Sequence, residues 1–148
     1  QVWLDGKEVT REIHDPSVGR ETSVLARWHK VREVMVARQR EMASSGSIVM
    51  VGRDIGTVVL PQADLKVFLL ASVEVRAARR QKELEERGQR IDYERVLRDV
   101  VERDRMDSER DASPLRPAPD ARHLNTDDLT LEQVVERILG MVRELDGE

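Results

Sequence analysis

Two short apolar runs, neither of them alternating with polar residues, constrain the fold of this chain more than any other feature. They span residues 48–51 and residues 65–70. Strands that are buried on both faces of a sheet have this pattern, whereas a strand with one solvated face alternates. Helical patterns follow in the sequence, so the strand and helix order predicts an α/β fold in which a parallel sheet is flanked by helices.

The remaining elements are predicted from periodicity and turn residues. Residues 1–12 have the pattern of a short hairpin around Asp5-Gly6, a dipeptide typical of tight turns. Apolar residues at spacings of three and four predict helices over 21–44, 73–87, 93–110 and 130–145. Gly88 ends the second of these, and Thr130 provides a plausible N-cap for the last. Residues 122–125 are expected to form a final short strand.

Composition excludes several classes of protein. The chain has 148 residues, enough for one domain with a core, and a formal net charge of −4, which argues against a dedicated nucleic-acid binder. It has no cysteine, and its three histidines lie far apart, so no metal site is expected. No apolar run approaches the roughly 20 residues that span a bilayer. We therefore expect a cytoplasmic protein without membrane or nucleic-acid partners.

Charged residues at the end of the first apolar run and on one helix face indicate a polar site. Arg53 and Asp54 follow the run at 48–51, where ligands bind in open parallel sheets. In the helix over 93–110, the apolar face continues into Arg103, Asp107 and Arg110. An inward-facing site for an anion explains this pattern. The alternative is an Asp-Arg pair at a fraying helix end, worth about 0.3 kcal/mol.

The helix over 73–87 contributes three arginines at helical spacing. Arg76, Arg79 and Arg80 share one face by angular count, and guanidinium groups bind phosphate oxygens in pairs of hydrogen bonds. Several arginines at one strand end suggest a site for more than one phosphate, as in phosphoryl transfer. A solvated basic face, balanced by the neighbouring glutamates, explains the same residues equally well.

The segments "VGRDIGTVVLPQADLKVFLLASVEVRAARR" and "ERDRMDSERDASPLRPAPDARHLNT" closely resemble the C-terminal two-thirds of bacterial cytidylate kinases, and "VWLDGKEVTREI" resembles the start of that family's nucleotide-binding insert. The resemblance implies a P-loop nucleoside-monophosphate-kinase fold, with residues 1–45 as part of the insert. Residues 46–148 would be the C-terminal part of the core, with a short lid around 76–91. It also implies transfer of phosphate from ATP to CMP or dCMP, with Mg²⁺.

The resemblance also implies roles for individual residues. Ser23, Arg32 and Asp54 match the residues that read the cytosine edge, although a continuous helix would place Ser23 and Arg32 on opposite faces. Arg103 and Asp107 match contacts to the sugar, and Arg53 and Arg110 match ligands of the acceptor phosphate. Arg79, with Arg76 or Arg80, matches the lid over the ATP phosphates. The expected catalytic residues are Arg53, Arg79 and Arg110.

One motif of the family is missing from these residues. No Gly-x-x-x-x-Gly-Lys-Ser/Thr loop, which cradles the donor phosphates, occurs in the sequence. The expectation is that this chain is the C-terminal part of a cytidylate kinase, with negligible kinase activity by itself. The complete enzyme is expected to be a monomer, whereas the chain as given would expose apolar surface and tend to self-associate.

Two other functions remain open at this point. One is a non-catalytic module that binds CMP or a partner through the acceptor half alone. The other is a UMP or AMP kinase of the same superfamily, whose arginine-rich lid looks similar. Base selectivity separates the latter, because Asp54 and Arg32 favour cytosine.

Overall fold

The computed structural model describes residues 1–26, 28–109 and 113–147, and the elements follow one another as expected for an α/β chain. The strands are β1 (Trp3–Leu4), β2 (Lys7–Glu8), β3 (Val67–Leu70) and β4 (Arg122–Asn125). The helices are η1 (Glu12–His14), α1 (Pro16–Leu25), α2 (His29–Ala43), the π-helix η2 (Ile55–Val59), α3 (Val73–Glu86), α4 (Tyr93–Glu109) and α5 (Leu131–Asp146). Within the described residues, no helix is long and apolar enough to cross a membrane.

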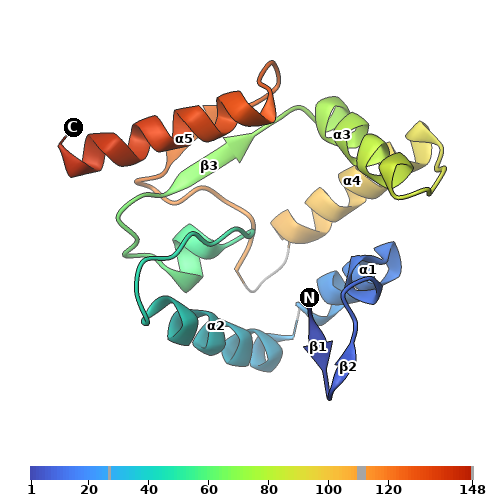
Figure 1. Ribbon diagram of the computed structural model, residues 1–148, viewed down its shortest axis with the longest axis horizontal. Helices are drawn as coiled ribbons and strands as arrows, with labels where there is room; N and C mark the ends of the chain where they lie inside the picture. Colours follow the sequence, from blue (N-terminus) through green and yellow to red (C-terminus); the bar gives the residue numbers. More distant parts are fainter. Residues whose placement is uncertain (27, 110–112, 148) are drawn as a thin grey trace.

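Strands β3 and β4 form a parallel pair, which confirms the predicted sheet type. Val67 lies opposite Arg122 and Leu70 opposite Asn125, so the two strands are in register over their whole length. Helices α3 and α4 are the crossover between them (Figure 1). The carboxyl ends of both strands therefore lie at one edge of the sheet, where α3 begins.

The predicted strand over residues 48–51 is wrong. These residues belong to no helix or strand, and Val49 and Val51 are 93% and 90% exposed. A strand requires hydrogen bonds to a neighbouring strand. Among the described residues, β3 pairs only with β4, so the apolar run has no partner. Apolar composition alone does not make a strand.

The core lies between α3 and α4. Ala77, Leu84 and Val96 are buried there, and residues of α4 and of the connection before it pack around them: Ile91, Tyr93, Leu97 and Val100. Helix α3 ends in a Schellman motif, in which the amide of Gly88 donates to the carbonyl of Glu85 and the amide of Gln89 to that of Leu84. Gly88 has φ +78°, a conformation that favours glycine. This stop turns the chain back so that α4 packs along α3.

The N-terminal part contains the predicted hairpin but not the predicted helix. β1 and β2 pair antiparallel around Asp5 and Gly6, both with positive φ, as a type I′ turn requires. The helix expected over 21–44 is two helices, because α1 ends at Leu25 and α2 begins at His29. Trp28 is the N-cap of α2 with extended backbone, so the break needs no proline.

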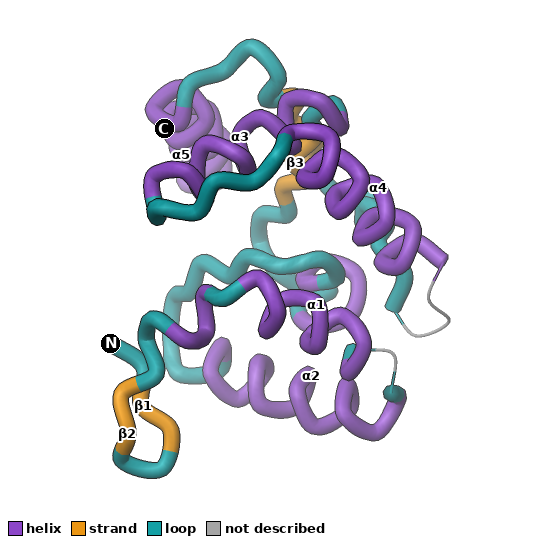
Figure 2. Tube along the Cα trace, turned by 90° about the vertical axis from the view of Figure 1, so that its right-hand side faces the viewer, coloured by secondary structure: helices purple, strands orange, loops and turns teal. Residues whose placement is uncertain are grey.

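The two halves of the chain lie on opposite sides of the molecule and touch where α1 contacts α4. Figures 1 and 2 show the hairpin, α1 and α2 gathered on one side, and β3, α3, α4 and α5 on the other. Helix α5 runs alongside β3 and begins with the predicted cap, a capping box in which Thr130 and Gln133 bond each other's backbone amides. The segment between α2 and β3, which contains Arg53 and Asp54, connects the two sides.

Candidate functional site

Asp54 lies where the unpaired apolar segment turns into the π-helix η2. Its carbonyl accepts hydrogen bonds from the amides of Val58, at 2.9 Å, and Val59, at 3.3 Å. Arg40 of α2 caps the other end of this turn, because its Nε and Nη2 donate to the carbonyls of Val59 and Val58 at 3.0 and 2.7 Å. Single π-helical turns are frequent at functional sites. The turn holds Asp54 buried, at 7% exposure.

Arg32 reaches Asp54 from the second turn of α2 and forms an ion pair with it. The Arg32 Nε also donates to the hydroxyl of Ser113, at 3.3 Å, so the guanidinium is held from two directions. This placement follows a break in the helix, since α1 ends at Leu25 and α2 begins at His29. The structure therefore brings together two of the three residues expected to read a base.

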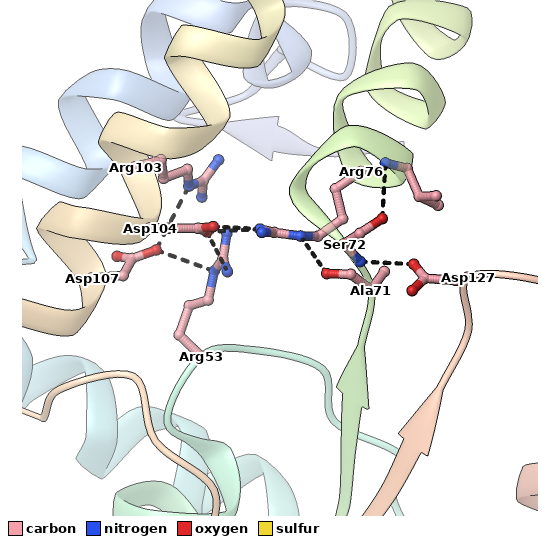
Figure 3. A network of polar contacts seen from close by, with 9 residues as sticks. Arg53, Ala71, Ser72, Arg76, Arg103, Asp104, Asp107 and Asp127 are labelled. Carbon is pink, nitrogen blue, oxygen red and sulfur yellow. Dashed lines mark hydrogen bonds and ion pairs between the residues drawn. The ribbon is translucent and has the colours of Figure 1, made fainter.

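A second polar cluster lies around Arg53 (Figure 3). The Arg53 Nε is 3.2 Å from Oδ2 of Asp107, and its Nη1 is 4.0 Å from Oδ1 of Asp104. Arg76, from α3, places its Nη1 2.6 Å from Oδ2 of Asp104. Arg103 lies 3.9 Å from Asp107 through its Nε. Three arginines from three segments thus surround two carboxylates of α4. One of them, Arg53, directly precedes Asp54 in the sequence.

Arg103, Asp107 and Arg110 were predicted to face inward at the end of α4; this is correct for Asp107 and wrong for Arg103, and Arg110 lies outside the described residues. Asp107 is 5% exposed on the face that also buries Val96, whereas the side chain of Arg103 is 49% exposed. The amide of Leu115 donates to the Asp107 carbonyl at 2.8 Å, which ties the chain after α4 to its last turn. A fraying helix end would not bury its carboxylate in this way.

Sequence reasoning missed Asp104, which joins Arg53 to Arg76. The signal was present in the same periodicity, because Asp104 follows Val100 by four residues on the buried face of α4. Its neighbour Arg103 was selected instead from this periodicity, and the resemblance then implied a contact to the sugar for it. The helical spacing was therefore sufficient to find Asp104, had it been applied to every polar residue at this end.

The three arginines of α3 do not converge on one point. Arg76 faces Asp104, and its Nε donates to the carbonyl of Ala71 at 3.1 Å. Arg79 turns to the chain after β4, where its Nη1 donates to the Thr126 hydroxyl at 3.0 Å. Arg80 pairs with Glu83 at 2.6 Å, one turn along the same helix. Arg80 is thus placed as on a solvated helix face, whereas Arg76 belongs to the cluster around Arg53.

The loop after β4 also contacts the start of α3. Asp127 accepts a hydrogen bond from the backbone amide of Ser72 at 2.7 Å, and Ser72 is the N-cap of α3. This hydrogen bond lowers the pKa of the Asp127 carboxyl below its ordinary value of 3.8. This hydrogen bond therefore connects the loop after β4 to the start of α3, the helix that contains Arg76 and Arg79.

Two expected site residues are outside what the structure describes. The backbone of Ser23 is in α1, but its side chain is not described, and Arg110 lies within 110–112, which is also not described. The described residues contain no group of histidine, aspartate and glutamate side chains suited to hold a metal ion. Hollows of about 770 and 310 Å³ lie elsewhere, and neither is lined by Arg53, Asp104 or Arg76.

The arrangement suits a ligand with a polar ring edge and an anionic group. Arg32 and Asp54 present donors and an acceptor within one buried pair, and the adjacent cluster presents guanidinium groups that bind phosphate or carboxylate oxygens. Its carboxylates are also acceptors for hydroxyl groups. Figure 3 shows the second of these groups, in which Arg53 and Arg76 face the carboxylates of α4.

A family model and individual relatives of known name agree on the family that this chain resembles. A family model described as cytidylate kinase matches residues 1–144. Cytidylate kinases from Thermosipho melanesiensis and Desulforamulus reducens are 49% and 50% identical to this chain over 142 and 143 residues, covering 96% and 97% of it. A cytidylate kinase from Geobacillus kaustophilus is 49% identical over 146 residues, or 99% of the chain. The chain spans 65%, 64% and 65% of the lengths of these relatives, respectively.

Proposed function

This chain belongs to the cytidylate kinase family, and from that premise we propose that its residues build the acceptor site of a kinase that transfers phosphate from ATP to CMP or dCMP. The observation that carries the proposal is the buried ion pair between Arg32 and Asp54, next in sequence to Arg53 and its cluster. The base edge and the phosphate of one nucleotide need these two kinds of group close together.

In this proposal Arg32 and Asp54, with Ser23, read the cytosine edge. The cytosine amino group donates to the Asp54 carboxylate, and its N3 and O2 accept from Arg32 and Ser23. Uracil has a carbonyl where cytosine has the amino group, so the carboxylate would oppose it. The ion pair holds both side chains in place before the base arrives, which reduces the entropy lost on binding.

The neighbouring cluster takes the sugar and the phosphate. Arg53 and Arg110 bind the acceptor phosphate, and Arg103 and Asp107 contact the sugar hydroxyl groups. Arg79, with Arg76 or Arg80, belongs to a lid around 76–91 that covers the ATP phosphates. Arg53, Arg79 and Arg110 then stabilise the charge that spreads over the transferred group in the transition state. Residues 1–45 act as the nucleotide-binding insert and 46–148 as the core.

The donor half needs more than these residues supply. A Gly-x-x-x-x-Gly-Lys-Ser/Thr loop does not occur in the 148-residue sequence, and the described residues offer no cluster for Mg²⁺. Mg²⁺ would neutralise charge on the ATP phosphates. We propose that the 148 residues alone bind CMP but transfer phosphate negligibly. In the complete, monomeric enzyme, the reaction belongs to cytoplasmic pyrimidine metabolism.

Calorimetric titration of the chain with CMP and with UMP tests the proposal. We expect CMP to bind more tightly than UMP by about 100-fold, since a carboxylate facing the wrong carbonyl costs about 3 kcal/mol. Asp54→Asn should remove most of this preference. Asp64→Asn, at an exposed aspartate ten residues further along, should leave it unchanged. Equal binding of CMP and UMP by the folded chain would contradict the assignment.

A further inference from the structure

Asp104 of α4 forms ion pairs with two arginines that come from different parts of the chain. Arg76 of α3 approaches both of its oxygens with one nitrogen, at 2.6 Å from Oδ2 and 2.8 Å from Oδ1. Arg53, from the segment before η2, approaches Oδ1 with its Nη1 at 4.0 Å. Figure 3 shows the two guanidinium groups meeting at this carboxylate. Asp104 is the point at which α3, α4 and the 48–54 segment are joined by charge.

Both arginines are also held at a second point, which leaves them little freedom to turn. The Nε of Arg76 donates to the carbonyl of Ala71, at the carboxyl end of β3. The Nε of Arg53 lies 3.2 Å from the buried carboxylate of Asp107. Neither of the two ion pairs of Arg53 uses its Nη2. Asp104 therefore holds the Arg76 guanidinium through close contacts and attracts that of Arg53 at ion-pair distance, while Ala71 and Asp107 each hold the Nε of one of the two arginines.

Two guanidinium cations repel each other when they are brought this close without an anion between them. Asp104 removes that repulsion in the absence of ligand, so that both arginines stay oriented toward one place. An oxyanion that arrives there meets two forks already aligned, and Arg forks gain most when their geometry is fixed in advance. The side chain of Asp104 is 28% exposed, so this place is open to solvent.

We infer that Asp104 is a positioning residue that pairs Arg53 with Arg76 into a two-arginine site for a phosphate group. The inference rests on the proposed acceptor site in taking the anion to be a phosphate monoester. It goes beyond that proposal in two ways. Arg76 binds the acceptor phosphate, and the orientation of the Arg76 guanidinium depends on Asp104. Arg79 and Arg80, which face other groups, are not part of this pair.

The test uses inorganic phosphate, which reports on the arginine pair and carries no base. The Nε–Hε signals of Arg53 and Arg76 in the nitrogen-15-labelled chain are assigned with Arg53→Lys and Arg76→Lys and are followed by NMR during a phosphate titration. We expect both signals to shift with one dissociation constant. Signals that do not respond to phosphate, in a chain that is folded, would overturn the inference.

The Asp104→Asn variant separates positioning from simple charge. Removing a negative charge beside an anion site should strengthen phosphate binding if Asp104 acts only through its charge. If Asp104 aims the arginines, binding should weaken, by about tenfold for the loss of one aligned charge-assisted contact. Asp99→Asn removes an equal charge from an exposed position of the same helix and should not weaken binding. Equal or tighter binding by Asp104→Asn would overturn the inference.

Arg76→Gln provides a second route if Asp104→Asn does not fold. It should weaken phosphate binding by a similar factor, and the double variant should be no weaker than either single one, because the two residues act as a unit. Unchanged phosphate binding by Arg76→Gln would overturn the inference. The proposed function fails separately, through equal binding of CMP and UMP, since that comparison depends on the base.

Discussion

Arg32 and Asp54, 22 residues apart in sequence, form an ion pair in which their side chains are only 14% and 8% exposed. The pair joins α2, on one side of the molecule, to the start of η2, which leads to the sheet on the other side (Figure 1). Removing one partner of a buried pair leaves the other charge without compensation in a poorly solvated place. The residues proposed to read the base therefore also contribute to stability.

A double-mutant cycle measures this contribution. We expect Asp54→Ala and Arg32→Met each to lower the free energy of unfolding by about 3 kcal/mol, because each leaves one buried charge. The double variant should lose much less than the sum, since no charge is then left unpaired. Urea denaturation followed by circular dichroism provides the values, with Asp64→Ala at an exposed position as the control. Additive losses would show that the two side chains do not interact.

Local signals in the sequence were sufficient for most elements. The hairpin, α3, α4, β4 and α5 were predicted correctly because turn residues, caps and helical periodicity are encoded within each segment. The segment 48–51 failed because a strand depends on a partner elsewhere in the chain, which local composition does not contain. The periodicity also did not predict the break before α2. Trp28 is the N-cap of α2, but tryptophan is not a residue type that marks the start of a helix.

The helical periodicity of α4 was sufficient to predict only part of the candidate site. The buried face of α4 was recognised through Asp107, and the same spacing also contains Asp104. The different directions of Arg76, Arg79 and Arg80 were not predictable, because residues at three and four positions apart share a helix face but not a partner. Asp104, Thr126 and Glu83 decide where each guanidinium points, and two of these three lie on other elements.

The start of α2 offers a stabilising substitution. Trp28 is the N-cap of this helix, is 66% exposed and makes no side-chain hydrogen bond to the first turn. Trp28→Ser should raise the free energy of unfolding by about 1 kcal/mol, because the hydroxyl can accept from the amide of Lys30 or Val31. Thermal unfolding checks this, and Trp28→Ala serves as the control without a cap. If the alanine variant gains as much as the serine variant, capping is not the cause.

The hydrogen bond from the Ser72 amide to Asp127 predicts a pH-dependent contribution to stability. The pKa of Asp127 is lowered in the folded chain, so its carboxylate stabilises the fold above the ordinary pKa of 3.8. That contribution is lost as pH falls from 3.8 through the lower folded value. We expect Asp127→Asn to have a lower melting temperature than the unmodified chain at pH 7.

The difference between the two melting temperatures should shrink as the pH falls from 3.8 through the lower folded pKa of Asp127, because its carboxyl then becomes protonated and neutral, as the asparagine amide is at every pH. Melting curves at several pH values between 7 and 2.5 provide the comparison. Asp128→Asn, at the next position, which is exposed, is the matched control and should show no such trend. A difference that stays constant across this range would mean that the charge of Asp127 is not involved.

The unpaired apolar segment before Arg53 predicts self-association of the chain as given. Val49 and Val51 expose most of their surface in a segment that belongs to no helix or strand, and an exposed β-branched segment of this kind can pair with another chain. Replacing both by threonine keeps the β-branched shape and removes one methyl group from each side chain. Sedimentation velocity at increasing concentration should show oligomers for the unmodified chain and a marked loss of them for Val49→Thr with Val51→Thr.

The control variant is Val34→Thr with Met35→Thr, at exposed apolar positions of α2, and it should associate as the unmodified chain does. If this control pair also abolishes association, general surface hydrophobicity is responsible and the segment at 48–51 is not.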